Sequence, residues 1–323
     1  MKLIELAEQL LGTLGVIQKQ DIQGVARSLN RLTPVVNPKI LLGDDCAAIP
    51  DQDGYLLLAA EGILPLLVET EPWFAGWCSV LVNVSDIYAM GGRPIAVVDA
   101  LWGTSTEAAE PVWAGMIAAS KAYKVPIVGG HTNCHSPYNA LSVAILGRAT
   151  HLITSFNSRP GDVLLAAIDL RGKPHPKHPF WNASTDVDPA RLCADLAILP
   201  ELASGLCDAG KDISMGGIIG TLLMLLETSG CGAVLNLDVI PRPEGIPIEQ
   251  WLLFFPSYGF LLSVRPENVA AVRAAFHSRN LVCEVVGEVH SSRQLTLKSE
   301  ADEVVFWDLS QKKFTGFSAQ PKL

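Results

Sequence analysis

The sequence predicts a two-domain α/β protein of the α+β type, in which helices pack against mixed sheets. Its 323 residues are enough for two domains of ordinary size. Hydrophobic residues make up 49% of the chain and charged residues 18%, which permits a substantial core and argues against disorder. Segments with strand and helix periods follow one another as β-β-α-β-α-β-β over residues 40–149, an order that favours a mixed sheet over strictly alternating β-α units.

The first half of the chain begins with two short amphipathic helices, predicted at residues 3–12 and 21–29. Two apolar segments follow, at residues 40–49 and 55–62, and both are predicted strands that end or turn at acidic residues. The stretch Trp77–Pro94 is then predicted to contain a helix that ends at a Gly-Gly pair and a proline.

This central helix is apolar around nearly its whole circumference. One face repeats at steps of three and four through Phe74, Trp77, Leu81, Val84 and Tyr88. The opposite face carries Ser79, Asn83, Asp86 and Met90. Asp86 is the only charged residue between Pro72 and Gly92, and a helix of this kind is normally buried. A buried carboxylate must be paired, hydrogen-bonded or metal-bound, so Asp86 is either a structural residue or a ligand.

The remaining elements follow the same two periods. The first half continues with strands at 95–102, 125–128 and 141–149 and a helix at 107–123. The second half is predicted to contain helices at 189–209, 216–229 and 266–279 and strands at 163–168, 232–238, 257–264, 281–289 and 293–298. Pro160-Gly161-Asp162 opens that half, and residues 170–182 form a loop without periodicity. We therefore predict domains at 1–152 and 153–323.

Charge and cysteine usage narrow the class of protein. A net charge of −9 argues against nucleic acid or an anionic membrane as the main partner, although divalent ions can bridge carboxylates to a phosphorylated ligand. Seven scattered cysteines are typical of reduced thiols in a cytosolic protein. The N-terminus lacks the apolar core of a signal peptide, and the apolar run 215–226 is too short to span a bilayer. These features predict a soluble cytoplasmic protein.

Acidic residues occupy four places where a sheet protein usually has turns or core: Asp44-Asp45, Glu61, Asp86 and Asp212. Each of these acids alone is weak evidence for a metal site, because an Asp-Asp pair after glycine is often a turn and Asp212 can cap a helix. Carboxylates that converge on one point repel each other and commonly hold a hard cation. Magnesium held in this way, with phosphates completing its coordination, is the usual arrangement for phosphoryl transfer.

Glycine pairs at element ends support phosphate binding without proving it. Gly91-Gly92, Gly129-Gly130 and Gly216-Gly217 could bring backbone N–H groups close to a phosphate, or could simply end helices and strands. The Walker and dinucleotide-binding glycine motifs are absent from the sequence, which disfavours those classes. A zinc site at His131, Cys134 and His135 is disfavoured because no second ligand pair completes it. No nucleophile elbow supports Ser-His-Asp catalysis.

Several of these segments together resemble a known superfamily. Gly43-Asp44-Asp45-Cys46-Ala47 is similar to its Asp-Asp-Ala-Ala element, and Asn83–Pro94 looks like its most specific signature. The further similar segments are Gly129-Gly130-His131-Thr132, Pro160-Gly161-Asp162 and Asp212–Gly217. On these motifs the chain resembles the ATP-binding (PurM-like) proteins related to aminoimidazole ribonucleotide synthetase, which include thiamine-monophosphate kinase, selenophosphate synthetase and a hydrogenase-maturation protein.

The resemblance implies a PurM-like fold, with an N-terminal mixed-sheet domain that pairs with its twin in a homodimer and a C-terminal α/β domain that closes over ATP. It implies that Mg²⁺ on ATP is held by the carboxylates, namely Asp44 or Asp45, Glu61 (where members usually carry Asp), Asp86 and Asp212. It also places other residues near the phosphates: Asn83, Gly91, Gly92, Gly129, Gly130, His131, Thr132, Gly216 and Gly217.

Departures from the family pattern bear on the reaction. Met215 stands where thiamine-monophosphate kinases usually carry an acid, His131 weakens the hydrogenase-maturation match, and the glycine-rich Cys/Lys segment of selenophosphate synthetase is missing. They indicate a separate branch. The leading hypothesis is γ-phosphoryl transfer from MgATP to a small polar metabolite, whose identity the sequence does not give. The alternatives are a nucleotide-binding regulatory or scaffold protein, and a structural oligomer whose acids are paired separately.

Overall fold

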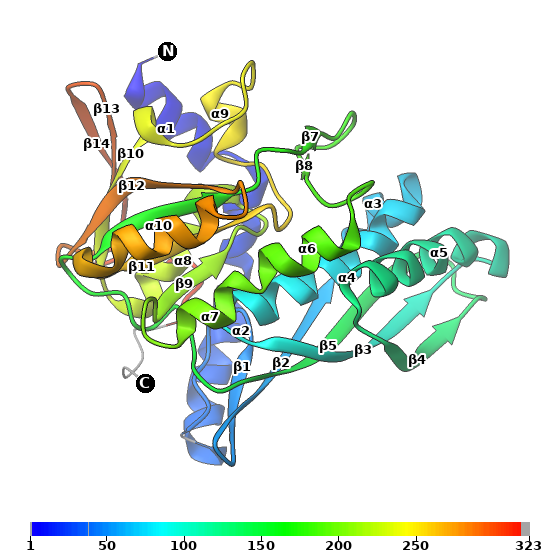
Figure 1. Cartoon of the computed structure of the whole chain (residues 1–323). Helices are drawn as coiled ribbons and strands as arrows, with labels where there is room; N and C mark the ends of the chain where they lie inside the picture. The colour runs from blue at the N-terminus through cyan, green and yellow to red at the C-terminus, as the bar shows by residue number, and fades with distance from the viewer. Residues whose placement is uncertain (1, 38, 318–323) are drawn as a thin grey trace. The chain divides into compact units, whose positions relative to one another are not determined.

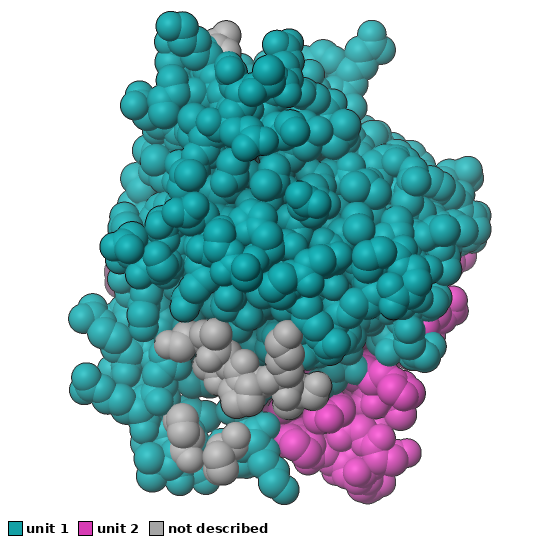
Figure 2. Space-filling model, turned by 90° about the vertical axis from the view of Figure 1, so that its left-hand side faces the viewer, with its two compact units in different colours: residues 1–45, 152–185, 202–323 teal, residues 46–151, 186–201 magenta. Residues whose placement is uncertain are grey.

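The computed structural model describes residues 2–37 and 39–317 (Figure 1). Contacts divide the chain into two compact units, coloured in Figure 2. Unit 1 comprises residues 1–45, 152–185 and 202–323, and unit 2 comprises residues 46–151 and 186–201. The N-terminal helices therefore group with the C-terminal half of the chain, and residues 186–201 group with the N-terminal half. A division of the chain at residue 152 alone does not describe these two exchanged segments.

Unit 2 is built on a five-stranded mixed sheet in the order β1-β2-β5-β3-β4. Its strands are β1 (Ala47–Asp51), β2 (Gly54–Gly62), β3 (Arg93–Trp102), β4 (Ile127–Asn133) and β5 (Ala140–Ala149). The β3–β4 pair is parallel and the other pairs are antiparallel. The helices are α3 (Pro65–Thr70), α4 (Pro72–Ala89), α5 (Thr106–Tyr123) and α6 (Pro189–Leu196). The mixed α/β class predicted from the sequence is confirmed.

Helix α4 confirms the central helix predicted from the sequence, and it is held tightly against its neighbours. A Cβ atom at Gly76 would come within 2.1 Å of the Val112 carbonyl oxygen on α5, and one at Gly115 within 1.9 Å of the Trp73 carbonyl oxygen. Only glycine permits so close an approach of the two helix backbones. Residues such as Val80, Val84 and Ile87 are fully buried, so α4 forms the core of unit 2.

Unit 1 is built on a seven-stranded sheet in the order β14-β13-β10-β12-β6-β11-β9. Its strands are β6 (Val163–Ile168), β9 (Ala209–Asp212), β10 (Gly232–Asn236), β11 (Gly259–Val264), β12 (Val282–His290), β13 (Gln294–Ser299) and β14 (Asp302–Asp308). The helices of this unit include α1 (Leu3–Leu11), α2 (Leu14–Val36), α8 (Gly217–Ser229), α9 (Ile248–Trp251) and α10 (Val269–His277).

Helices cover both faces of this sheet. Leu164, Ala166 and Ile168 of β6 belong to the core cluster that α8 and α1 share, while the alternate residue Leu165 faces the side that α10 covers (Figure 1). Such two-sided burial explains why β6 reads as a continuous apolar run. Among the described residues, none of the helices combines the length and the apolar character that crossing a membrane requires.

Several segments differ from the prediction. The helix expected at 189–209 is two short helices, α6 and α7 (Ile198–Ala203), followed by strand β9. Pro200 lacks the N–H that would bond back to residue 196, so a continuous helix breaks there. Helix α2 is much longer than predicted because Leu14, Val25 and Leu32 are exposed and obscure the apolar period. Helix α3 and strand β14 were not predicted. The loop 170–182 contains a small hairpin of β7 (Lys173–Pro174) and β8 (Trp181–Asn182).

Candidate functional site

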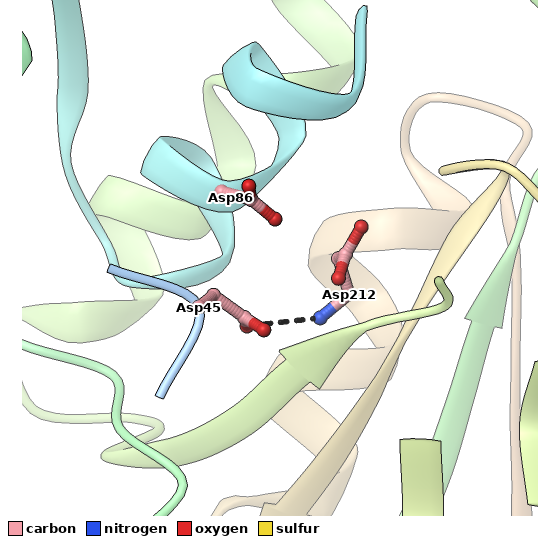
Figure 3. A group of neighbouring side chains, drawn as sticks. All are labelled: Asp45, Asp86 and Asp212. Carbon is pink, nitrogen blue, oxygen red and sulfur yellow. Dashed lines mark hydrogen bonds between the residues drawn. The ribbon is translucent and has the colours of Figure 1, made fainter. Parts of the chain in front are cut away.

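Three acids and one lysine of unit 1 lie together where β9 ends. Asp44 and Asp45 precede β1, while Lys211 and Asp212 are the last residues of β9. The Lys211 Nζ atom lies 2.5 Å from Asp45 Oδ1 and 3.6 Å from Asp44 Oδ1. The Asp212 amide donates to Asp45 Oδ2 at 3.3 Å, the dashed line in Figure 3. Asp45 and Asp212, which are far apart in the sequence, thus lie side by side within one unit.

Asp44 and Asp45 face different surroundings although they are neighbours. The Asp44 side chain is 1% exposed and accepts backbone N–H groups from Ser155 at 2.8 Å and from Asp45 at 3.0 Å. Burial raises the pKa of the Asp44 carboxyl to about 6, against the opposing effect of the Lys211 ammonium group. Asp44 is therefore tied into the protein, and Asp45 is the member of the pair whose carboxylate reaches Asp212.

Lys211 was missed by the sequence analysis. Its side chain is 3% exposed. Burial by itself would lower the pKa of its ammonium group, but the carboxylates of Asp45 and Asp44 outweigh burial and raise that pKa above its usual value. The signal that could have found it is a lysine inside the short segment Ala209–Asp212, every residue of which is buried. A buried lysine requires an anionic partner.

Asp212 stands next to the N-terminal end of α8. Its Oδ2 accepts a hydrogen bond from the Ser257 hydroxyl at 3.1 Å, and a carboxylate oxygen lies within 4.8 Å of one from Asp45. Gly216 and Gly217 have φ values of +101° and +62°. A Cβ at Gly217 would meet the Leu252 carbonyl oxygen at 2.2 Å, so glycine is needed there. The first N–H groups of a helix and its dipole favour an anion at this end.

The corresponding acid of unit 2 is Asp86, which projects from α4 in Figure 3 and is 5% exposed. Asn83, one turn earlier, is fully buried and donates from Nδ2 to the Ser79 carbonyl oxygen at 2.8 Å. Among the described residues, Asn83 Oδ1 has no hydrogen-bond partner. A buried amide oxygen left in this state calls for an explanation, and an absent ligand or cation is one.

Gly91 and Gly92 close the C-terminal end of α4. Gly91 has a φ of +72°, its N–H donates to the Tyr88 carbonyl oxygen at 2.8 Å, and the Gly92 N–H donates to that of Ile87 at 2.9 Å. Both amides are thus used in a helix cap. That Gly91 and Gly92 lie near a phosphate stays a prediction. Phosphate binding would require each N–H group to donate to a second acceptor as well.

The other predicted site residues of unit 2 lie in strands. Residues 129–132 lie inside the edge strand β4, and not at the strand break that the glycines suggested; all four are exposed, and the His131 ring lies 6.2 Å from that of Trp102. Glu61 lies near the end of β2, in the same cross-strand row as Gly130 but three strand spacings away, about 14 Å. These two groups cannot share one ligand atom.

Asp99 of β3 is a second residue, after Lys211, that the sequence analysis missed. Burial raises its pKa, and a Cβ at Gly130 would come within 2.3 Å of Asp99 Oδ1. Gly130 therefore has a structural reason to be glycine, because the Asp99 side chain fills the space beside it. The signal was an acid in the otherwise apolar strand segment Ile95–Trp102.

Comparison with known proteins identifies the family. The model of the N-terminal domain of AIR synthase related proteins matches residues 43–149, and the model of the C-terminal domain matches residues 170–300. The chain belongs to the AIR synthase-related family. The resemblance drawn from the Asp-Asp, Asn83–Pro94 and Asp212–Gly217 segments is thereby confirmed, as is the PurM-like fold.

Relatives of this AIR synthase-related chain include a kinase, and similar solved structures include a complex with ATP. It is 57% identical to the uncharacterized protein sll0787 of Synechocystis sp., over 98% of this chain and 99% of that one. It is 24% identical to thiamine-monophosphate kinase of Buchnera aphidicola, over 82% and 89%. The structure of T. maritima PurL complexed with ATP has a TM-score of 0.70 at 18% identity, covering 94% of this chain and 53% of PurL. The chain thus spans about half the length of PurL.

The donor set of the site suits a hard divalent cation. Asp45 and Asp212 of unit 1 offer carboxylate oxygens, which are a ligand type that Mg²⁺ prefers. No cysteine or histidine belongs to the unit 1 cluster, so the chemistry of these side chains does not favour zinc or copper. The residues present therefore fit Mg²⁺.

Proposed function

We propose that this chain is a magnesium-dependent ATP-binding enzyme that transfers the γ-phosphoryl group of ATP to a small polar metabolite. Mg²⁺ would be held by Asp45, Asp212 and Asp86, with Asn83 nearby and the phosphates next to the N-terminal end of α8. Support comes from the family and from relatives such as thiamine-monophosphate kinase and the ATP-bound PurL. When bound, the metal ion would neutralise charge on the phosphates.

The observation that carries the proposal is the pairing of Asp45 with Asp212 beside α8. Two carboxylates within 4.8 Å of each other repel, and the protein retains them there although Asp212 is only 1% exposed. A cation that bridges them would remove the repulsion, and a helix N-terminus beside it would attract the phosphates that carry the cation. Catalysis would then consist of positioning and charge neutralisation.

Substitution of the metal ligands tests this proposal. Asp86→Asn and Asp212→Asn should each weaken Mg-dependent ATP binding at least about tenfold, which corresponds to ~1.4 kcal/mol, while circular dichroism stays unchanged. The matched control is Asp238→Asn, an exposed acid of unit 1. Titration calorimetry with and without Mg²⁺ measures the affinity. Unchanged ATP affinity in both folded variants would contradict the metal assignment.

Turnover separates the enzyme from a regulatory or scaffold protein. Purified protein incubated with MgATP and a panel of phosphate-accepting metabolites should release ADP only with the correct acceptor. Tight ATP binding without ADP release for any acceptor would favour the scaffold alternative. Residues 170–182 either cover the acceptor or form a solvated crossover. Replacement of the β7–β8 hairpin by a short glycine linker should raise the acceptor KM more than the ATP KM in the first case and leave both unchanged in the second.

We further propose that unit 2 forms a homodimer through the face of its sheet that α4 does not cover. Leu57, Val97 and Ile145 are buried on the α4 side, whereas Leu58 and Val98 on the other face are 47% and 43% exposed. Cross-strand rows place Leu58 beside Leu146, and Val98 beside Ala144. An apolar sheet face of this kind is normally covered by another layer.

Charge placed on that sheet face tests the dimer. Leu58→Glu/Val98→Glu should shift the protein from dimer to monomer in analytical ultracentrifugation, because burying two carboxylates against an apolar partner is costly. Val305→Glu, at an exposed apolar position of β14 in unit 1, is the matched control and should leave the dimer intact. A wild-type protein that sediments as a monomer at micromolar concentration would contradict the proposal.

A further inference from the structure

The Asp44–Asp45 pair already has a cation, and that cation is part of the chain. We infer that the Lys211 ammonium group occupies the position between Asp44 and Asp45 that a divalent metal ion would otherwise take. The wild-type site therefore binds one divalent ion fewer than its carboxylates could hold. The inference deepens the proposed function because it limits which acids can serve MgATP, but its main test needs no nucleotide.

Distances and burial support Lys211 as the cation between Asp44 and Asp45. Its Nζ atom lies 2.5 Å from Asp45 Oδ1 and 3.6 Å from Asp44 Oδ1, and all three side chains are at most 7% exposed. A lysine ammonium has three donors and no acceptor, and it is a compact point charge. It therefore substitutes for a small cation between two carboxylates more readily than a planar guanidinium group would.

The charge balance excludes a second cation at the same place. Asp44 and Asp45 together carry at most two negative charges, and Lys211 cancels one of them in a position shielded from water. A divalent ion placed between the pair would lie within a few ångströms of the ammonium group and would be repelled at low dielectric. Asp45 Oδ2, which accepts from the Asp212 amide, is the side of the pair that can still face a metal ion.

The backbone contacts of Asp44 support the same division. Its two carboxylate oxygens each accept one N–H group, from Asp45 and from Ser155, which fixes the orientation of the carboxylate and leaves acceptor capacity on each oxygen for a cation. Both acids compensate the charge of Lys211, which is hydrogen-bonded to Asp45 Oδ1, and Asp45 Oδ2 with Asp212 forms the side that we assign to the nucleotide. Of the acids predicted as ligands in unit 1, Asp45 contacts both Lys211 and Asp212, so we assign Asp44 to the lysine alone and Asp45 to both sides.

Removal of the lysine charge should expose the hidden cation position. In nucleotide-free protein, Lys211→Met should bind one more Mn²⁺ per chain than wild type, counted by electron paramagnetic resonance, and its Tm should rise by several degrees with Mn²⁺. Lys298→Met, at a half-buried lysine of β13 paired with Glu303, is the matched control and should leave the Mn²⁺ count unchanged. Lys211→Met/Asp44→Asn/Asp45→Asn should lose the additional ion.

Three results would overturn the inference. The first is a folded Lys211→Met chain whose Mn²⁺ count equals that of wild type. The second is a Lys211→Met chain that stays unfolded with and without Mn²⁺, because the carboxylates would then have accepted no metal ion in place of the ammonium group. The third needs no lysine variant: Asp44→Asn should leave Mn²⁺ binding in the presence of ATP unchanged, and a lower count would assign Asp44 to a metal ion. Failure of the proposed function would instead appear as intact ATP binding in Asp212→Asn.

Discussion

Unit 1 contains two sites with buried carboxylates, and the negative charge is compensated in a different way at each. The Asp44–Asp45 pair is compensated by the charge of Lys211, whereas the donors to Glu227 of α8 that the described part of the chain supplies are all neutral. Glu227 Oε1 accepts N–H groups from Phe314 at 2.8 Å and Gly316 at 3.2 Å. Its Oε2 accepts the N–H and the hydroxyl of Thr315 at 2.7 and 2.6 Å. Both sites are nearly inaccessible to water.

The difference separates a structural acid from a functional one. Three backbone N–H groups and one hydroxyl of residues 314–316 saturate Glu227, so exchange of any partner leaves a buried group unsatisfied. An ammonium group is held mainly by charge, and another cation can replace it in principle. Burial alone therefore does not identify a metal site, and the type of partner is the informative property.

The largest effect should come from removal of the cation. Lys211→Met in metal-free buffer should lower the free energy of unfolding by about 4 kcal/mol, because two buried carboxylates lose the cationic side chain that they share. Urea denaturation measures the change. Addition of Mn²⁺ should restore a substantial part of the loss, and equal destabilisation with and without Mn²⁺ would remove the distinction between the two sites.

A smaller loss, independent of metal, is expected at the neutral site. Glu227→Gln keeps the shape but points an NH₂ group at backbone N–H groups, and it should cost about 2 kcal/mol. Because Phe314–Gly316 would lose their anchor, limited proteolysis should cleave the C-terminal segment faster. A Glu227→Gln protein whose stability responds to Mn²⁺ as that of Lys211→Met does would contradict the comparison.

The sequence predicted the elements with strong local signals. Helix α4 was found because a period of three and four over eighteen residues leaves few alternatives. The family was found because its motifs are local. Lys211 was not found, since its significance depends on Asp44 and Asp45, which lie more than 160 residues earlier in the chain. Strand β9 was missed because four residues are too few to show a period, and the apolar residues before it extended the predicted helix.

A substitution at Ser257 tests how far neutral donors also orient the candidate ligands. The Ser257 hydroxyl donates to Asp212 Oδ2 at 3.1 Å, so Ser257→Ala should cost about 1 kcal/mol of stability. The same substitution should weaken Mg-dependent ATP binding severalfold, because Asp212 loses the contact that orients it. Ser278→Ala, which removes an exposed hydroxyl bonded within its own helix end, is the control for the loss of a hydroxyl group. If the two variants bind ATP equally, Ser257 does not orient a ligand.

The smallest effect belongs to an acid that uses neutral donors as Glu227 does but lies fully exposed. Asp238 accepts the Glu300 N–H at 2.6 Å and the Ser299 hydroxyl at 2.7 Å, and these hydrogen bonds lower the pKa of its carboxyl. A lowered pKa means that the native state binds its proton less readily than the unfolded chain. This contribution to stability is present above about pH 4, the ordinary value, and is lost as the pH falls through the native pKa. Asp238→Asn should therefore flatten only the acid limb of the stability profile measured by urea denaturation between pH 2 and pH 5. A change in metal binding at neutral pH in this variant would show that exposure does not separate Asp238 from the Asp45–Asp212 pair.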